Sequence, residues 1–165
     1  MPPDARFMEH DKQMTQSKSI NPTKWDSRWM DLAKLVSSWS KDRSRKCGAV
    51  VVDDRHTPVA LGWNGFPRGV DDNVEARHER PEKYKWTEHA ERNAIYNAAS
   101  TGAILSGSTM YITWFPCCDC ARGIIQSGIK RVVCLSSDMD DPNWKDSFSV
   151  SQAMMEESGI EILLI

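Results

Sequence analysis

Three of the five cysteines in this 165-residue chain lie within four consecutive positions, and this cluster restricts the chain's possible fold more than any other feature. Cys117 and Cys120 are three residues apart at the start of a predicted helix, so both thiols fall on one face of it. The dipole at a helix N-terminus favours thiolates there. Cys118 faces another side of the helix. We therefore expect Cys117 and Cys120 to serve a metal ion or catalysis.

The rest of the chain favours reduced cysteines. Residues 1–7 contain no apolar run typical of a signal peptide, and no stretch approaches the ~18 apolar residues of a membrane span. Without a secretory route we expect free thiols, a cytoplasmic location and no membrane partner. Cys47 and Cys134 lie in apolar strand patterns and are expected to be core residues.

A histidine and a carboxylate lie in the first turn of another predicted helix. Zinc binds imidazole nitrogen and thiolate sulfur, and catalytic zinc sites use three protein ligands plus water. Both helices follow segments that could end at the same edge of a sheet, so His89, Cys117 and Cys120 could converge on one ion. Glu91 could then take a proton from the metal-bound water and pass it to a leaving group. The alternative is a closed structural site with Cys118 or another residue as fourth ligand.

Helical and strand patterns alternate along most of the chain. We expect helices over residues 23–41, 87–102, 117–127 and 146–158, and strands over 47–52, 59–64, 109–113, 131–135 and 160–164. The first two strands form a hairpin, and the later alternation predicts parallel strands joined by helical crossovers. Residues 65–86 have no periodicity and are predicted to be a long loop, which is uncommon unless the loop carries function.

Length and charge favour one domain that acts on a small molecule. Residues 1–21 are polar and without period, so we expect a flexible arm there, ordered only against a neighbouring subunit. Residues 22–165 are expected to form a single domain. The chain has 21 Lys+Arg and 23 Asp+Glu, a net charge of −2, whereas domains that bind nucleic acid polymers usually carry a positive excess.

Five segments resemble the zinc-dependent cytidine and deoxycytidylate deaminase superfamily, most closely its deoxycytidylate (dCMP) branch. They span about residues 25–164 and are Cys47–Val52, Gly62–Gly69, His89–Ile95, Pro116–Ala121 and Ser127–Ile129. The order His-x-Glu, then Pro-Cys-x-x-Cys, is the signature of zinc nucleobase deaminases, in which the Glu is not a ligand. The resemblance implies an α/β fold with three α/β/α layers and a five-stranded mixed sheet.

The resemblance also implies an activity. One catalytic zinc ion would be held by His89, Cys117 and Cys120, and zinc-bound hydroxide would deaminate a cytosine nucleotide, dCMP to dUMP and ammonia, with Glu91 as proton shuttle. Asn64 would help to hold the sugar or phosphate, and backbone groups near Ala90 and Cys117 would read the base edge. Relatives of this kind form homo-oligomers, often dimers or hexamers.

Some positions depart from the usual pattern of this branch. Trp114 and Phe115 are bulky where a small or polar residue is common; they either narrow the pocket or stack on the base, or else pack into the core. Arg92 replaces an apolar residue and either meets a phosphate or lies on a solvated helix face. Arg68, beside the Asn64 segment, is the first candidate for the phosphate, against a plain salt bridge.

Two other readings of the sequence stay open. The chain could deaminate another substrate, such as cytidine, a 5-substituted dCMP or adenosine in tRNA, although the last predicts a basic face that a net charge of −2 does not favour. It could also be a non-catalytic scaffold that keeps zinc for folding. An intact Glu91 speaks against the scaffold, because structural zinc does not require that carboxylate.

Overall fold

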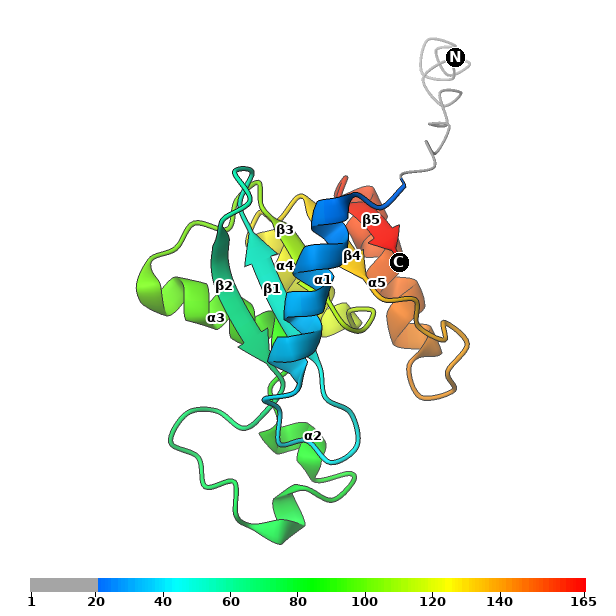
Figure 1. The fold of residues 1–165 in the computed structure, drawn as a ribbon. Coiled ribbons are helices and arrows are strands. Elements are labelled where there is room, and N and C mark those ends of the chain that lie inside the picture. Colours follow the sequence, from blue (N-terminus) through cyan, green and yellow to red (C-terminus); the bar gives the residue numbers. More distant parts are fainter. Residues whose placement is uncertain (1–20) are drawn as a thin grey trace, which may run out of the picture.

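A five-stranded mixed sheet lies at the centre of the computed structural model, which describes residues 21–165 (Figure 1). The strands are β1 (Gly48–Val52), β2 (Pro58–Trp63), β3 (Thr109–Ile112), β4 (Arg131–Cys134) and β5 (Glu161–Leu164). Their order across the sheet is β2-β1-β3-β4-β5. β1 is antiparallel to β2 and β3, whereas β3, β4 and β5 are parallel. The expected mixed sheet is confirmed.

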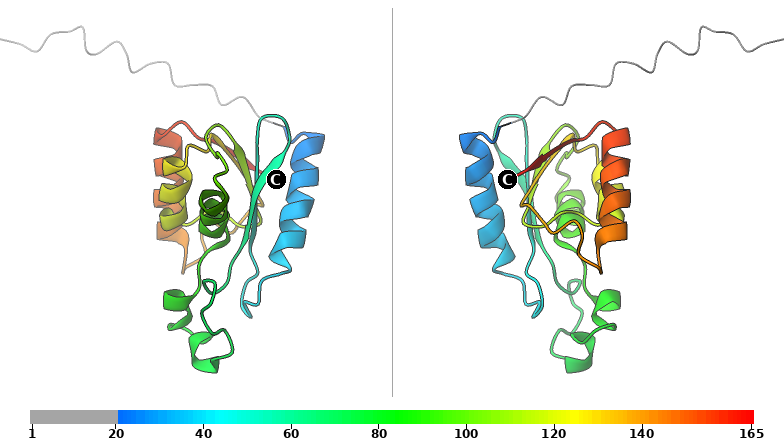
Figure 2. Two further views of the ribbon diagram at one scale, coloured as in Figure 1. Left: turned by 90° about the vertical axis from the view of Figure 1, so that its left-hand side faces the viewer. Right: turned by 90° about the vertical axis from the view of Figure 1, so that its right-hand side faces the viewer.

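Helices cover both faces of the sheet and complete three layers. The helices are α1 (Lys24–Ser37), α2 (Lys83–Trp86), α3 (Ala90–Thr101), α4 (Cys118–Gln126) and α5 (Lys145–Glu157). α1 covers one face alone, and α3, α4 and α5 cover the other (Figure 2). None of the helices within residues 21–165 is both long and apolar enough to cross a membrane. The flexible arm expected over residues 1–21 lies, except for Asn21, outside the described residues.

The segment before α3 differs from the sequence prediction. Residues 65–86 contain a short 3-10 helix, η2 (Glu75–Arg77), and α2, rather than an unbroken loop. The predicted start of the next helix at residue 87 is wrong, because Thr87 ends α2 and His89 is the N-cap of α3. Glu88 instead pairs with Gly65 through two backbone hydrogen bonds, of 3.0 and 2.8 Å, which keep this segment extended.

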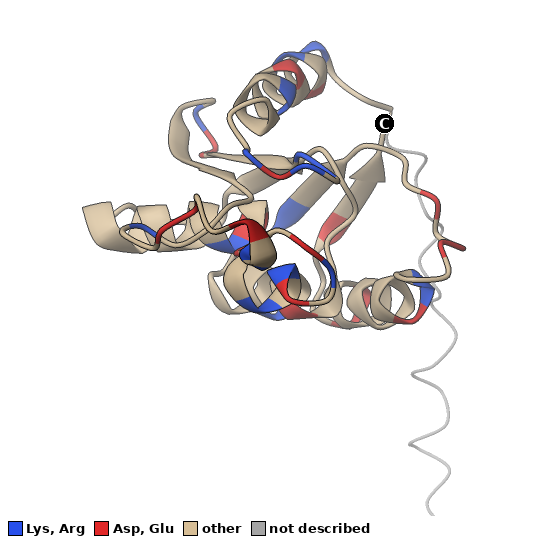
Figure 3. Cartoon of the chain, turned by 90° about the horizontal axis from the view of Figure 1, so that it is seen from below, with Lys and Arg blue, Asp and Glu red and all other residues tan. Residues whose placement is uncertain are grey.

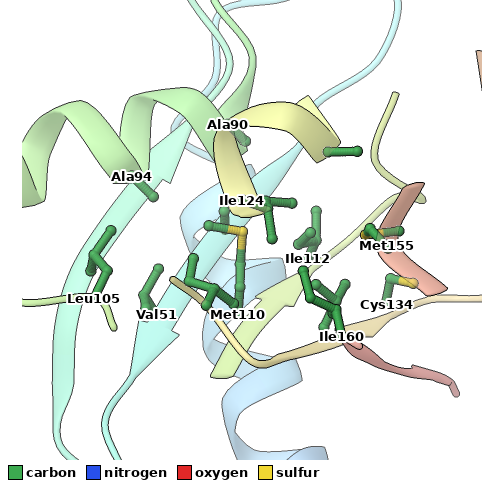
Figure 4. Packing of buried hydrophobic residues seen from close by; sticks show 14 of the residues in the cluster. Val51, Ala90, Ala94, Leu105, Met110, Ile112, Ile124, Cys134, Met155 and Ile160 are labelled. Atoms are coloured by element: carbon green, nitrogen blue, oxygen red, sulfur yellow. The ribbon is translucent and has the colours of Figure 1, made fainter. Parts of the chain in front are cut away.

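Two apolar clusters hold the layers together. Met30, Ala33 and Val36 of α1 pack on Val50 and Val133 of the sheet. On the other face, Met110, Ile112 and Cys134 of the sheet pack against α3, α4 and α5, whose side chains include Ile124 of α4 and Met155 of α5 (Figure 4). Cys134 is fully buried, as predicted. Burial of this apolar area stabilises the fold.

Two glycines on neighbouring strands let helices approach the sheet closely. A Cβ built on Gly48 would overlap the carbonyl oxygen of Ala33 in α1. A Cβ built on Gly62 would overlap the carbonyl oxygen of Ala90 and the amide nitrogen of Ala94 in α3. The first turn of α3 therefore rests directly on the backbone of β2, and this contact fixes where the helix begins.

A buried carboxylate joins α1 to side chains of β3 and β4. Asp26 forms a capping box with Thr23, at the start of α1. It also accepts hydrogen bonds from Tyr111 Oη (3.0 Å) and from the guanidinium of Arg131 (2.6 Å). Burial alone would raise the pKa of Asp26, but the hydrogen bonds from Arg131, Thr23 and Tyr111 outweigh it and lower the pKa to about 2.

Candidate functional site

A cavity of about 240 Å³ opens at the end of the sheet where β3 ends. Its lining comes from residues 42–47, 64, 80–91, 114–117 and 141–148, which lie far apart in the sequence. The segment that contains α2 extends below the sheet in Figure 1 and forms part of this lining. Two helices, α3 and α4, begin at the cavity, so their positive N-termini face it.

Three potential metal ligands meet where α3 and α4 begin. His89 is the N-cap of α3, Cys117 is the N-cap of α4, and Cys120 lies in the first turn of α4. His89 Nδ1 is 3.5 Å from Cys117 Sγ and 3.4 Å from Cys120 Sγ, and all three ligand atoms lie within 4.8 Å of one another. Zinc bonds of about 2.05 Å to nitrogen and 2.3 Å to sulfur, at a tetrahedral angle, separate the two atoms by about 3.6 Å. The three residues therefore fit one zinc ion.

The fourth ligand of a closed site is missing from this cluster. Within residues 21–165 the ligand group consists of His89, Cys117 and Cys120. The half-buried Cys118 lies outside it, and its backbone N–H donates a 3.0 Å hydrogen bond to Ser147 Oγ. Three protein donors leave one position for water, which is the pattern of catalytic rather than structural zinc.

The surroundings of the Cys117 thiol favour a charged sulfur. A hydrogen bond from Cys120, followed in size by one from His89, lowers the pKa of Cys117 to about 4 against the burial that would raise it. The same bond to Cys117 raises the pKa of His89. Because zinc binds the thiolate, a sulfur that is deprotonated at neutral pH is prepared for metal.

Glu91 lies beside these ligands but outside their cluster. Its side chain lines the cavity, and the residue is 5% exposed. Burial raises the pKa of Glu91, because the charged carboxylate loses its water. A buried carboxyl that lines the same cavity as the three ligands can take up and release protons there.

Aromatic rings form one wall of the cavity. Phe115 is 2% exposed and packs on Phe148 at a ring distance of 5.3 Å. Trp114 is half-buried and lies 6.2 Å from Phe148. Both therefore line the cavity and pack against the core at once. Trp144 adds to the wall: its ring stacks on Phe148 at 6.1 Å and meets the His89 ring edge-on at 6.2 Å.

Asn64 and Ala90 both lie at the cavity, as expected. Asn64 uses both polar atoms of its side chain within the protein: Oδ1 accepts the Cys47 N–H at 2.7 Å, and Nδ2 donates to the Arg45 carbonyl at 2.9 Å. It thereby fixes the segment that enters β1. Cys47, expected in the core, is instead half-buried and lines the cavity.

Arg68 does not reach this cavity. Its guanidinium donates to Asn97 Oδ1 at 2.6 Å and borders a separate surface hollow beside Tyr96. The phosphate role predicted for Arg68 therefore lacks a geometric basis. Arg92 also lies elsewhere, since its Nε donates to Glu88 Oε1 at 2.5 Å, in keeping with a role on the helix surface.

Other cations occupy the rim of the cavity: Arg45, Arg80 and Lys83. The sequence offered no spacing signal for Arg45, Asn143 or Trp144, and the length of the 65–86 segment was the one hint for Arg80 and Lys83. Seen from below, this end of the molecule has basic and acidic residues interspersed (Figure 3). Arg45, Arg80 and Lys83 are thus a local group of cations at the rim and not part of a wider basic face.

Comparison with known proteins agrees with this geometry. Residues 23–136 match the family model described as the cytidine and deoxycytidylate deaminase zinc-binding region. An "uncharacterized deaminase in luxG 3′ region" of Aliivibrio fischeri is 41% identical over 141 residues, 85% of this chain and 92% of its own length. The deoxycytidylate deaminase of Homo sapiens is 35% identical over 141 residues, 82% of this chain and 76% of its own length. The crystal structure of dCMP deaminase from cyanophage S-TIM5 in complex with dCMP and dUMP superposes with a TM-score of 0.71 at 28% identity, covering 88% of this chain and 100% of that one.

Proposed function

The chain belongs to the cytidine and deoxycytidylate deaminase family, and from that premise we propose that it hydrolyses the amino group of a cytosine nucleotide, dCMP, to give dUMP and ammonia. The observation that carries this proposal is the cavity in which His89, Cys117 and Cys120 meet beside the buried Glu91. Relatives and a solved structure named for dCMP support the choice of substrate.

The three ligands and Glu91 have separate tasks in this proposal. His89, Cys117 and Cys120 would hold a zinc ion, which would supply the Lewis acidity that activates water for attack at C4 of the base. Glu91 accepts the proton of that water and delivers it to ring N3. Glu91 then transfers the remaining proton of the attacking water, now on the C4 hydroxyl, to the amino nitrogen, which leaves as ammonia. Burial suits Glu91 to this work, because it raises the pKa of the carboxyl and so favours the protonated form more than water does.

The aromatic wall and the start of α3 bind the base of the substrate in this proposal. Phe115 and Phe148 present apolar surface that excludes water, and Trp114 and Trp144 flank them. The backbone at Ala90, which lines the cavity, lies where it can read the polar edge of the ring. Apolar walls with a few placed polar groups are typical of small-molecule sites.

The rim cations support a phosphorylated substrate. Arg45, Arg80 and Lys83 line the same cavity as the metal ligands. A monophosphate needs cationic or N–H donors, and a guanidinium can bind it through two parallel bonds. These residues take the place of Arg68 in the phosphate role.

A panel of substrates tests the proposal. The zinc-loaded chain would be incubated with dCMP, 5-methyl-dCMP, cytidine, dCTP and a tRNA, while ultraviolet absorbance and ammonia release are followed. We expect the highest kcat/KM for dCMP. Zinc-bound protein that turns over none of them would overturn the enzymatic proposal in favour of a scaffold. Turnover of tRNA alone would overturn the assignment of dCMP as substrate.

Two predictions from the sequence accompany this function. Family resemblance predicts a homo-oligomer, a dimer or a hexamer, and the free cysteines predict a cytoplasmic setting. Sedimentation velocity of the zinc-loaded chain would test the first, and fractionation of cells that express it would test the second.

A further inference from the structure

We propose that Arg45, held against the indole of Trp114, is the residue that makes this site select a nucleotide monophosphate over the corresponding nucleoside. The inference rests on the proposed function, because it concerns the substrate of the same cavity. It assigns a specificity-determining role to Arg45 and positioning roles to Trp114, Asp42 and Asn64.

The guanidinium of Arg45 lies flat against an aromatic support. Its Cζ is 3.4 Å from the ring centroid of Trp114, and both residues line the cavity. An arginine stacked in this way uses the face of its plane and keeps its N–H groups free at the edge. Across residues 21–165 the Arg45 side chain forms no hydrogen bond or ion pair, so those donors are available to a ligand.

The backbone of Arg45 is fixed from both sides. Asp42 Oδ1 accepts the N–H groups of Ser44 (2.7 Å) and Arg45 (3.0 Å). Asn64 Nδ2 donates to the Arg45 carbonyl at 2.9 Å, and its Oδ1 accepts the N–H of Cys47 at 2.7 Å. Because the peptide groups on both sides are bonded to side chains, less conformational freedom is lost when a ligand binds.

Lys83 and Arg80 lack this arrangement. Lys83 Nζ donates to both carboxylate oxygens of Asp42, at 3.0 and 2.8 Å, and the two side chains are 10% and 7% exposed. Its charge is therefore compensated before any ligand arrives. Arg80 borders the cavity from the segment between η2 and α2 and has no stacked aromatic partner among the described residues. Arg45 is the rim cation that combines an uncompensated charge with a fixed position.

This arrangement predicts a difference between two substrates with the same base. The monophosphate of dCMP can accept two parallel N–H···O bonds from Arg45, whereas deoxycytidine offers no anion. Hydrogen bonds to charged groups are the stronger class, so the discrimination should appear in kcat/KM.

Kinetics with dCMP and deoxycytidine test Arg45 directly. Arg45→Ala is expected to lower the ratio of the two kcat/KM values by about 10- to 100-fold. Arg45→Lys should recover only part of the ratio, because an ammonium binds as a point charge. Arg68→Ala, the matched control outside the cavity, should change the ratio by less than about twofold. Since Arg45 is exposed, its replacement should leave the fold intact.

The support from Trp114 has a test of its own. Trp114→Leu keeps an apolar wall but removes the π face, so KM for dCMP should rise by about tenfold with a smaller change in kcat. Trp114→Phe should restore most of the lost affinity. A merely structural role would lower kcat and thermal stability together, with no rescue by Phe.

Binding without turnover separates this inference from the proposed function. Titration calorimetry would compare dUMP with deoxyuridine on the wild type and on Arg45→Ala. Tighter binding of dUMP that depends on Arg45 supports the inference even if dCMP proves inert, a result that would overturn the proposed function alone. An unchanged preference in Arg45→Ala would overturn the inference while leaving deamination of dCMP intact.

Discussion

Two buried carboxylates lie at opposite ends of the sheet and differ in what surrounds them. Asp26 is 1% exposed and sits where β4 begins, within reach of Thr23, Tyr111 and Arg131. Glu91 is 5% exposed and sits beyond the end of β3, beside the candidate zinc ligands. The pKa of Asp26 is lowered to about 2, whereas burial raises the pKa of Glu91.

The difference lies in the number of hydrogen bonds that each carboxylate receives. Asp26 accepts them from a backbone N–H, two hydroxyls and a guanidinium, which together outweigh the cost of burial. The charge on Asp26 is thereby locked in and stabilises the fold. Glu91 lacks a compensating arginine at hydrogen-bond distance in the described residues, so burial raises its pKa, which suits a group that takes up and releases protons. The comparison predicts that the two residues fail in different ways when changed.

The largest effect is expected at the metal ligands beside Glu91. Cys120→Ala should reduce the zinc content from about one equivalent to nearly none and abolish turnover, because two ligands hold zinc poorly. Cys118→Ala is the matched control and should keep both, since Cys118 lies outside the ligand cluster. Atomic absorption on the two purified variants checks this; equal zinc in both would contradict the ligand assignment.

Glu91→Gln should separate chemistry from stability. Loss of the proton carrier is expected to lower kcat by about 10²–10⁴-fold. Zinc content should be retained, and the Tm should stay the same or rise, because a buried carboxylate is replaced by a neutral amide. Steady-state kinetics and calorimetry on one preparation would measure both. Retained turnover would contradict the proposed role of Glu91 as proton carrier.

Asp26→Asn should give the reciprocal result. Removing the carboxylate breaks its charge-assisted hydrogen bonds and leaves Glu161 as the carboxylate that pairs with Arg131, so the free energy of unfolding should fall by about 2 kcal/mol. The value of kcat/KM should stay within about twofold at temperatures where the variant is folded. Urea denaturation monitored by tryptophan fluorescence would show it; an unchanged midpoint would mean that Asp26 contributes little.

Acid should reversibly remove the stabilisation that the Asp26 carboxylate gives to the fold. The pKa of Asp26 is about 2 in the fold against 3.8 for an unperturbed carboxyl. Its stabilisation is therefore complete above the unfolded value and is lost as the pH falls from about 4 towards 2, by about 2 kcal/mol. The difference between wild type and Asp26→Asn in urea midpoints should shrink over this range. A constant difference would contradict the lowered pKa.

Residues that act through local rules could be predicted from the sequence, and those that act across the fold could not. His89, Cys117 and Cys120 followed from helix starts and ligand spacing, and Gly102 ended α3 as a left-handed cap. Arg131 and Asp26 lie too far apart in the sequence for any periodicity to pair them. The residues at the cavity rim could not be predicted for the same reason. Loops bring Arg45, Arg80 and Trp144 together only once the sheet has formed.

The error in the predicted start of α3 has a similar origin. Thr87 has the chemistry of an N-cap, and nothing local distinguishes it from one. The competing partner is Gly65, whose backbone pairs with Glu88 and holds it extended until His89. A long-range pairing thus overrides the local signal and moves the helix start onto a metal ligand.

The contact of Gly62 with α3 bears on how freely this protein can change over evolutionary time. The helix that carries Glu91 meets β2 backbone to backbone at this glycine, so no side chain sets the spacing between helix and strand there. A substitution that adds a Cβ at Gly62 would push the start of α3, and Glu91 with it, away from the sheet. This position is therefore expected to accept substitution less readily than the core side chains, which can repack.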